Sequence, residues 1–192
     1  MNSYFKASAI IFLLGGILGP LGDIYHVFSM TTGYPDHYAY YIQGIPWWVF
    51  PFFGASGLAI GMSYHFMNFQ GDKFQSKGFI HAFTGPVIFL LSYFLSGYFT
   101  VIKSPTFLNH IILGAIFAII WWLYGKTWRS LLLSVWFSFL GIIVEVTLVK
   151  MGVFWYTSHD NQLFGVASWL PWLYLILAIT IGNFTHFLIK KH

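Results

Sequence analysis

The sequence predicts an all-α integral membrane protein, built as a bundle of six transmembrane helices. Apolar stretches recur along all 192 residues, and only 7% of the residues are charged. The mean hydropathy is +0.72. Roughly 20 helical residues cross a hydrocarbon core of about 30 Å, which holds no water to satisfy an open backbone. We therefore expect one six-helix membrane domain, residues 1–192, and no separate soluble domain.

The predicted spans follow one another with short connections. The first span has Lys6 before an apolar run, as a signal peptide would, but no small-x-small cleavage site follows, so we predict a retained helix. The six spans run approximately from Lys6 to Val27, Gly44 to Met67, Lys77 to Thr100, Thr106 to Tyr124, Arg129 to Lys150 and Trp169 to Leu188.

Glycines and prolines inside the spans predict how these helices pack. The pairs Gly15–Gly19 and Gly57–Gly61 have the small-xxx-small spacing that lets two membrane helices approach closely. Pro20 and Pro86 each remove a hydrogen bond to the carbonyl four residues earlier. We expect these prolines to bend their helices and to free a polar carbonyl.

The distribution of Lys and Arg predicts the orientation. Positive residues of short loops stay in the cytoplasm, which puts both termini there. The formal net charge of +4 largely reflects this asymmetry, and it indicates contact with anionic lipid headgroups rather than with nucleic acid. The face with the N-terminus carries Lys6, Lys73, Lys77, Lys126, Arg129, Lys190 and Lys191, whereas the other face carries Lys103 and Lys150.

Tryptophans and tyrosines gather near the span ends. An amphipathic ring is stable at headgroup depth, so interfacial belts explain most of them. An aromatic cage around a cofactor is the alternative. The residues are Trp47, Trp48, Trp121, Trp122, Trp128, Trp155, Tyr156, Trp169, Trp172 and Tyr174.

Ionisable and amide side chains inside the spans are the strongest candidates for a site. Asp23 and His26 stand three apart on one helical face, and Glu145 has apolar neighbours. A charge at mid-bilayer costs about 2.5 to 3.5 kcal/mol, so such a residue normally faces the bundle interior and has a partner. The candidate ligand-binding residues are Asp23, His26, His81, Asn109, Glu145, Trp155, Tyr156, Trp169 and Asn183.

Known catalytic and metal-binding motifs are missing from the sequence. It contains no HExxH, GxSxG, P-loop or GxGxxG motif. A His-carboxylate metal site from Asp23, His26, His81 and Glu145 would lack any diagnostic spacing. Because the chain has no cysteine, disulfides and thiolate ligands are excluded. We expect no metal, no cofactor and no catalytic residue.

Three ordered motifs in the last 85 or so residues resemble the insulin-induced gene (INSIG) family. They are GVFWYTS at residues 152–158, SWLP at residues 168–171 and ITIGN at residues 179–183. The pairs Asn109-His110 and Trp121-Trp122 also resemble the family in order and approximate spacing.

The resemblance implies a six-helix, non-enzymatic membrane protein with cytoplasmic termini. Animal members bind oxysterols and retain an escort protein and a sterol-synthesising reductase in the endoplasmic reticulum, and bacterial homologues resemble lipid binders with a central cavity. Where animal members have an acidic residue that binds the escort protein, this chain has Gly125, followed by Lys126. That interaction is therefore not expected. The short loops favour a prokaryotic homologue in the cell inner membrane, and a eukaryotic one would lie in the endoplasmic reticulum.

Residues and resemblance together predict a regulatory, non-catalytic membrane protein that binds a lipid in a cavity of the bundle. Apolar and aromatic walls with a few polar anchors are usual for such a pocket. The expected ligand is diacylglycerol- or sterol-like, and the expected partner is a membrane protein or a second copy of the chain. The alternatives are a membrane enzyme that uses Asp23, His26 and Glu145 in acid-base chemistry on a lipid or isoprenoid, and third a small transporter.

Overall fold

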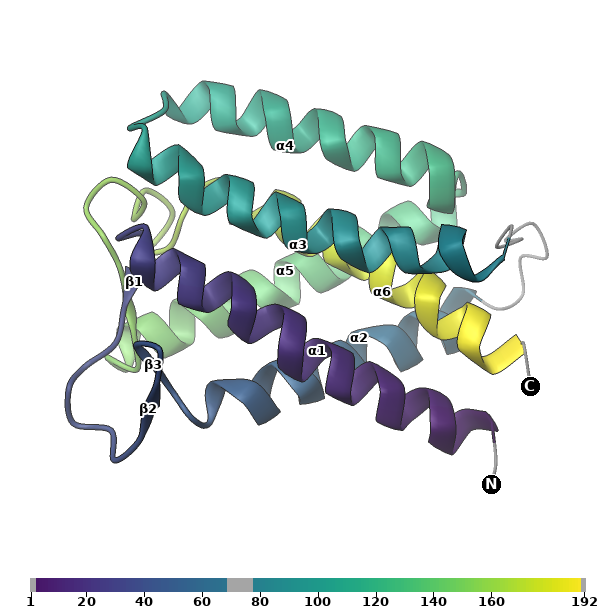
Figure 1. Ribbon diagram of the computed structural model, residues 1–192. Coiled ribbons are helices and arrows are strands. Elements are labelled where there is room, and N and C mark those ends of the chain that lie inside the picture. The colour runs from purple at the N-terminus through teal and green to yellow at the C-terminus, as the bar shows by residue number, and fades with distance from the viewer. Residues whose placement is uncertain (1–2, 69–77, 191–192) are drawn as a thin grey trace.

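The structure is a computed structural model, of which we describe residues 3–68 and 78–190. Six α-helices in this part of the chain form an elongated bundle (Figure 1). They are α1 (Ser3–Phe28), α2 (Val49–Asn68), α3 (Phe79–Val101), α4 (Thr106–Ile120), α5 (Trp128–Lys150) and α6 (Leu170–Lys190), and a π-helical turn, Trp121–Gly125, continues α4. Four short strands, β1 (Thr32–Gly33), β2 (Tyr41–Ile42), β3 (Ile45–Pro46) and β4 (Trp155–Tyr156), lie in the connections.

The predicted six-helix membrane bundle is confirmed. Five helices, α1, α3, α4 with its π-helical turn, α5 and α6, are long and apolar enough to cross a membrane. The 20 residues of α2 also suffice for the length of a span, but its glycines and His65 make it less apolar. The predicted positions Lys73, Lys77 and Lys191 lie outside the described residues.

The predicted start of the second span is wrong. The helix begins at Val49 rather than at Gly44, because β2 and β3 form a hairpin just before it. Gln43 and Gly44 link these strands with φ angles of 52° and 87°. Two successive residues with positive φ make the tight turn of a two-residue hairpin, which reverses the chain instead of starting a helix.

The helix α6 lies at the centre of the bundle. Each of the other five helices packs on it. Within its most apolar stretch, 72% of the residues are buried in the protein, against 17% for α5. It runs among the other helices in Figure 1, and both described chain ends lie at one end of the bundle. α6 therefore provides the common core surface.

Glycines bring α1 and α2 into backbone contact, as their spacing predicted. A Cβ on Gly15 would lie 2.7 Å from the carbonyl oxygen of Phe53, and one on Gly54 would lie 2.9 Å from that of Phe12. Any larger residue would separate the two helices. The prolines lie on buried faces, and α1 and α3 continue through Pro20 and Pro86.

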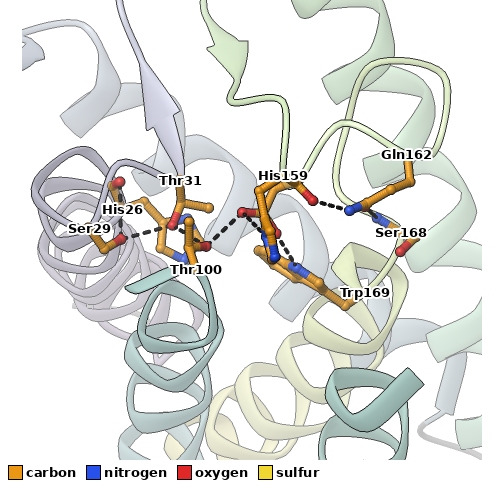
Figure 2. A network of polar contacts seen from close by, with 9 residues as sticks. His26, Ser29, Thr31, Thr100, His159, Gln162, Ser168 and Trp169 are labelled. Carbon is orange, nitrogen blue, oxygen red and sulfur yellow. Dashed lines mark hydrogen bonds and ion pairs between the residues drawn. The ribbon is translucent and has the colours of Figure 1, made fainter. Parts of the chain in front are cut away.

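The connecting segments 29–48 and 151–169 form a cap at the end of the bundle opposite the termini (Figure 1). β1 and β4 pair antiparallel, so the two segments are joined. A polar network ties the two segments of the cap together and fastens the cap to α3 (Figure 2). The buried carboxylate of Asp160 accepts hydrogen bonds from Thr100 Oγ1 at 2.7 Å and from Trp169 Nε1 at 3.0 Å.

Candidate functional site

Two acidic side chains from distant parts of the chain share one pocket beneath the cap. Asp23 lies near the end of α1 and is buried, and Glu145 lies in the last turns of α5 and is half-buried. The residues around this polar pocket come from the cap and from α1, α2, α3 and α5. They are Asp23, Thr32, Tyr34, Trp48, Val49, Phe52, Phe53, Tyr93, Glu145, Leu148, Phe154 and Tyr156.

Tyrosine hydroxyls hold both carboxylates. Tyr34 donates to Asp23 Oδ2 at 2.5 Å. Tyr174 donates to Glu145 Oε1 at 2.9 Å, and Tyr156 donates to Glu145 Oε2 at 3.2 Å. Desolvation and the nearby carboxylates raise the pKa of Tyr34 and of Tyr156, both of which lie in the cap, well above the ordinary value. Both hydroxyls therefore remain protonated and act as donors.

Glycines next to the two carboxylates make room for these rings. A Cβ on Gly141, one helical turn before Glu145, would lie 2.5 Å from the ring of Tyr174. A Cβ on Gly22 would overlap the ring of Tyr93. Each carboxylate thus has, within one helical turn, a glycine that makes room for an aromatic ring against the helix.

An apolar groove lies beside the polar pocket, between α2, α5 and α6. Its volume is about 330 Å³. Phe53 lines both the pocket and the groove, and Tyr174, which binds Glu145, lines the groove. The groove is lined by Phe52, Phe53, Ser56, Ala59, Ile60, Ser63, Phe137, Leu140, Gly141, Val144, Tyr174 and Leu177. Together the two cavities have a polar end and an apolar body.

One polar group in the pocket has no partner among the described residues. The buried Oγ1 of Thr32 makes no hydrogen bond within residues 3–68 and 78–190. Buried hydroxyls normally find a partner, so this group marks room for a polar atom of a ligand or for water. The described lining contains no Lys or Arg, and its charged groups are acidic.

Three of the predicted site residues lie beside the pocket rather than in its wall. His26 is buried, and its Nε2 donates to the carbonyl oxygen of Tyr93 at 3.1 Å, toward α3. The buried Trp169 binds Asp160, and Trp155 lies on the outer side of the β1–β4 pair, against Gly33. These residues support the pocket and its cap.

Three other predicted residues lie away from the pocket, and none of the described cavities is lined by them. The ring of His81 packs on Tyr124 with 4.6 Å between centroids. Asn183 Nδ2 donates to the carbonyl oxygen of Tyr124 at 3.4 Å, near the α4–α5 turn. Asn109 is buried near the start of α4. The structure therefore brings together Asp23, Glu145 and Tyr156 but not these three.

The sequence reasoning missed the pocket residues Tyr34, Tyr93 and Thr32, and it missed Tyr174, which lines the groove and binds Glu145. The position of Tyr174 near a span end predicts an interfacial belt, but its hydroxyl faces inward to Glu145. The available signal was chemical, since a carboxylate inside a bundle needs donors, and a tyrosine hydroxyl donates while its ring suits an apolar wall. No spacing in the sequence identifies which of the 12 tyrosines these are.

A Ser-His pair elsewhere in the structure does not form an activated nucleophile. His110 Nε2 lies 3.2 Å from Ser168 Oγ, and Trp172 Nε1 donates to His110 Nδ1 at 3.0 Å. Since Nδ1 accepts this bond, the neutral ring carries its proton on Nε2. Nε2 therefore donates to the serine hydroxyl and cannot take its proton.

Similar sequences are found among the insulin-induced gene proteins. The chain is 26% identical to the bovine (Bos taurus) insulin-induced gene 1 protein over 185 residues, which are 93% of this chain and 64% of that protein. The chain thus spans less than two thirds of the bovine protein. It is 28% identical over 181 residues to the insulin-induced gene 2 protein of Gallus gallus, covering 91% of this chain and 76% of that protein. No family model matches the chain.

A solved structure has the same fold. The mycobacterial Insig homolog MvINS from Mycobacterium vanbaalenii matches with a TM-score of 0.87 and 23% identity, covering 97% of this chain and 96% of that chain. A cross-linked MvINS trimer matches equally well. The resemblance to the insulin-induced gene proteins that the three motifs predicted is thus confirmed along nearly the whole chain.

Proposed function

We propose that this insulin-induced-gene-like membrane protein binds one uncharged membrane lipid, with the polar head of the lipid in the polar pocket and its apolar part in the groove. The observation that carries the proposal is that the two cavities adjoin, because Phe52 and Phe53 line both of them. The pair Asp23 and Glu145 lines the polar pocket, and the apolar groove beside it has a volume of about 330 Å³. A small-molecule site of this size is typically apolar with a few fixed polar groups.

The charge of the pocket selects the head of the lipid. Two carboxylates line it, without a described Lys or Arg. A phosphate charge 4 to 6 Å from a carboxylate would be repelled by roughly 3 to 4 kcal/mol at an effective dielectric constant of about 20. Hydroxyl groups, in contrast, would donate to the free lone pairs of Asp23 and Glu145 and pair with the Thr32 hydroxyl. A diacylglycerol-like or sterol-like alcohol therefore fits best.

The role that we propose is regulatory, in one membrane domain that spans residues 1–192. The cross-linked trimer of MvINS supports a homo-oligomer for this chain. We further propose that both termini face the cytoplasm, because Lys and Arg gather at that end.

The experiment compares two lipids that differ only in a phosphate. Protein purified in mild detergent is offered a diacylglycerol and the phosphatidic acid with the same acyl chains, and retained lipid is measured by native mass spectrometry. We expect the protein to retain the diacylglycerol in preference to the phosphatidic acid. Asp23→Asn or Glu145→Gln should weaken this retention roughly two-fold to a hundred-fold. A hydrogen bond to a charged group contributes about 1.5 to 3 kcal/mol and a neutral one about 0.5 to 1.5 kcal/mol.

Asp36→Asn is the matched control, because Asp36 is an exposed acidic residue of the cap outside the pocket. Equal or better retention of phosphatidic acid would contradict the proposal. Conversion of the lipid by the wild type, lost in Glu145→Gln while binding survives, would instead establish a membrane enzyme.

A further inference from the structure

The turn between α4 and α5 has a fixed and compact shape. Lys126 and Thr127 alone separate the π-helical turn from α5. Lys126 has a φ of 35°, and its N–H donates to the carbonyl oxygen of Trp121 at 2.7 Å. Thr127 Oγ1 accepts from the N–H of Ser130 at 3.2 Å. A Cβ on Gly125 would lie 2.7 Å from Ser130 Oγ, so only glycine allows this close packing.

This turn presents two cations together with two exposed tryptophans. Lys126 Nζ lies 3.8 Å from the centroid of the Trp122 ring. Arg129 is exposed in the first turn of α5. Trp122 and Trp128 are 61% and 75% exposed. Because exposed tryptophan rings settle at headgroup depth in a bilayer, they hold both cations at the level of the lipid phosphates.

No described carboxylate neutralises these cations. The acidic residues within the described ranges, Asp23, Asp36, Glu145 and Asp160, belong to the cap or to the helix ends beside it, whereas the turn lies at the end of the bundle with the termini (Figure 1). Within residues 3–68 and 78–190, the structure contains no ion pair to Lys126 or Arg129. Arg129 also stands at a helix N-terminus, where the helix dipole disfavours a cation. An anion bound at the turn would offset the unfavourable interaction of Arg129 with the helix dipole.

We propose that the α4–α5 turn binds the phosphate of an anionic membrane phospholipid. Lys126 and Arg129 pair with the phosphate, while Trp122 and Trp128 contact the glycerol and the upper acyl chains. The site does not depend on the function proposed for the pocket. It selects the opposite kind of lipid, because the pocket is acidic and the turn is basic.

The test uses protein in bilayer nanodiscs of phosphatidylcholine, alone or with phosphatidylglycerol. Retained phosphatidylglycerol is counted by native mass spectrometry, and the thermal midpoint is measured in each disc. We expect phosphatidylglycerol to be retained by the wild type and to raise its midpoint. Lys126→Gln and Arg129→Gln should each reduce retention about five-fold, as expected for one cation at a membrane surface.

Lys103→Gln is the matched control, because Lys103 is also an exposed lysine with positive φ in a helix-helix turn, at the other end of the bundle. It should leave retention within about two-fold, because Lys103 lies outside the proposed site, whereas loss of a cation that contacts the lipid costs about five-fold. An equal loss in Lys103→Gln, or equal retention of both phospholipids by the wild type, would overturn the proposal. If inorganic phosphate raised the thermal midpoint by as much as phosphatidylglycerol does, the assignment of the site to a lipid would be overturned.

Discussion

Gly182→Ala should destabilise the protein by forcing α2 away from α6. A Cβ on Gly182 would lie 2.8 Å from the Cβ of Tyr64 and overlap its ring, which is 1% exposed and cannot move into lipid. Overpacking of this kind costs about 1 to 3 kcal/mol. Replacing a helical glycine with alanine also stabilises the helix by roughly 0.5 to 1 kcal/mol, because alanine loses less backbone entropy on folding. A second glycine is therefore needed to separate the two effects.

Gly114→Ala is that control. Gly114 lies inside α4, and a Cβ there would have Trp172 Cη2 as its nearest neighbour at 3.5 Å, an ordinary contact. Both variants gain the same backbone contribution, so their difference isolates the overlap with Tyr64. A difference of about 1 to 3 kcal/mol corresponds to a thermal midpoint roughly 2 to 12 °C lower for Gly182→Ala.

The assay is the midpoint of monodisperse protein after heating, read by fluorescence-detected size-exclusion chromatography. Adding Tyr64→Leu to Gly182→Ala should recover part of the loss, because the smaller, flexible side chain can move aside. Equal midpoints for Gly182→Ala and Gly114→Ala would refute the reasoning and mean that α2 and α6 are not in such close contact.

The orientation and the polar contacts lead to three further predictions. A single cysteine introduced at Lys103 should be labelled from outside intact cells, and one introduced at Lys126 only after permeabilisation. The reverse pattern would show that the protein has the opposite orientation in the membrane. Asn183→Leu should lower the thermal midpoint, since an interhelical polar contact contributes about 0.6 kcal/mol, and an unchanged midpoint would show that its amide contributes nothing. Asp160→Asn should lower the free energy of unfolding by about 1 to 3 kcal/mol, because the buried carboxylate accepts several hydrogen bonds. The control Asp36→Asn, at an exposed residue, should leave the thermal midpoint unchanged. Similar midpoints for the two variants would contradict the role of the network.

The helices could be predicted because lipid restricts the backbone so strongly. A segment without water must satisfy its own hydrogen bonds, so hydropathy alone places a helix such as α5 within a residue of its observed start. The exception is the start of α2, where local turn geometry at Gln43 and Gly44 decided the structure. Hydropathy carries no information about φ angles, and the Pro46-Trp47-Trp48 run resembles the start of a helix.

The site could be predicted only in part, because a pocket depends on contacts between distant segments. Asp23 and Glu145 each stand out as a costly residue inside a span, but nothing in the sequence pairs them. Tyr156 and Tyr174 resemble interfacial anchors, since a tyrosine near a span end suits both a headgroup and a buried carboxylate. Asp160 resembles an exposed loop residue, yet the packing of the cap buries it.

The central position of α6 has a consequence for biosynthesis. The other five helices precede it in the sequence, so they enter the membrane while the surface on which they will pack does not yet exist. Until α6 inserts, the inward faces of its neighbours, including small and polar residues such as Gly61, Gly85 and Ser134, are exposed to lipid or to insertion factors. Completion of the bundle therefore waits for α6. Before that step α1 and α2 can already pair through their glycines, but a nascent chain stalled before α6 would leave the other inward faces open and recognisable to membrane quality control.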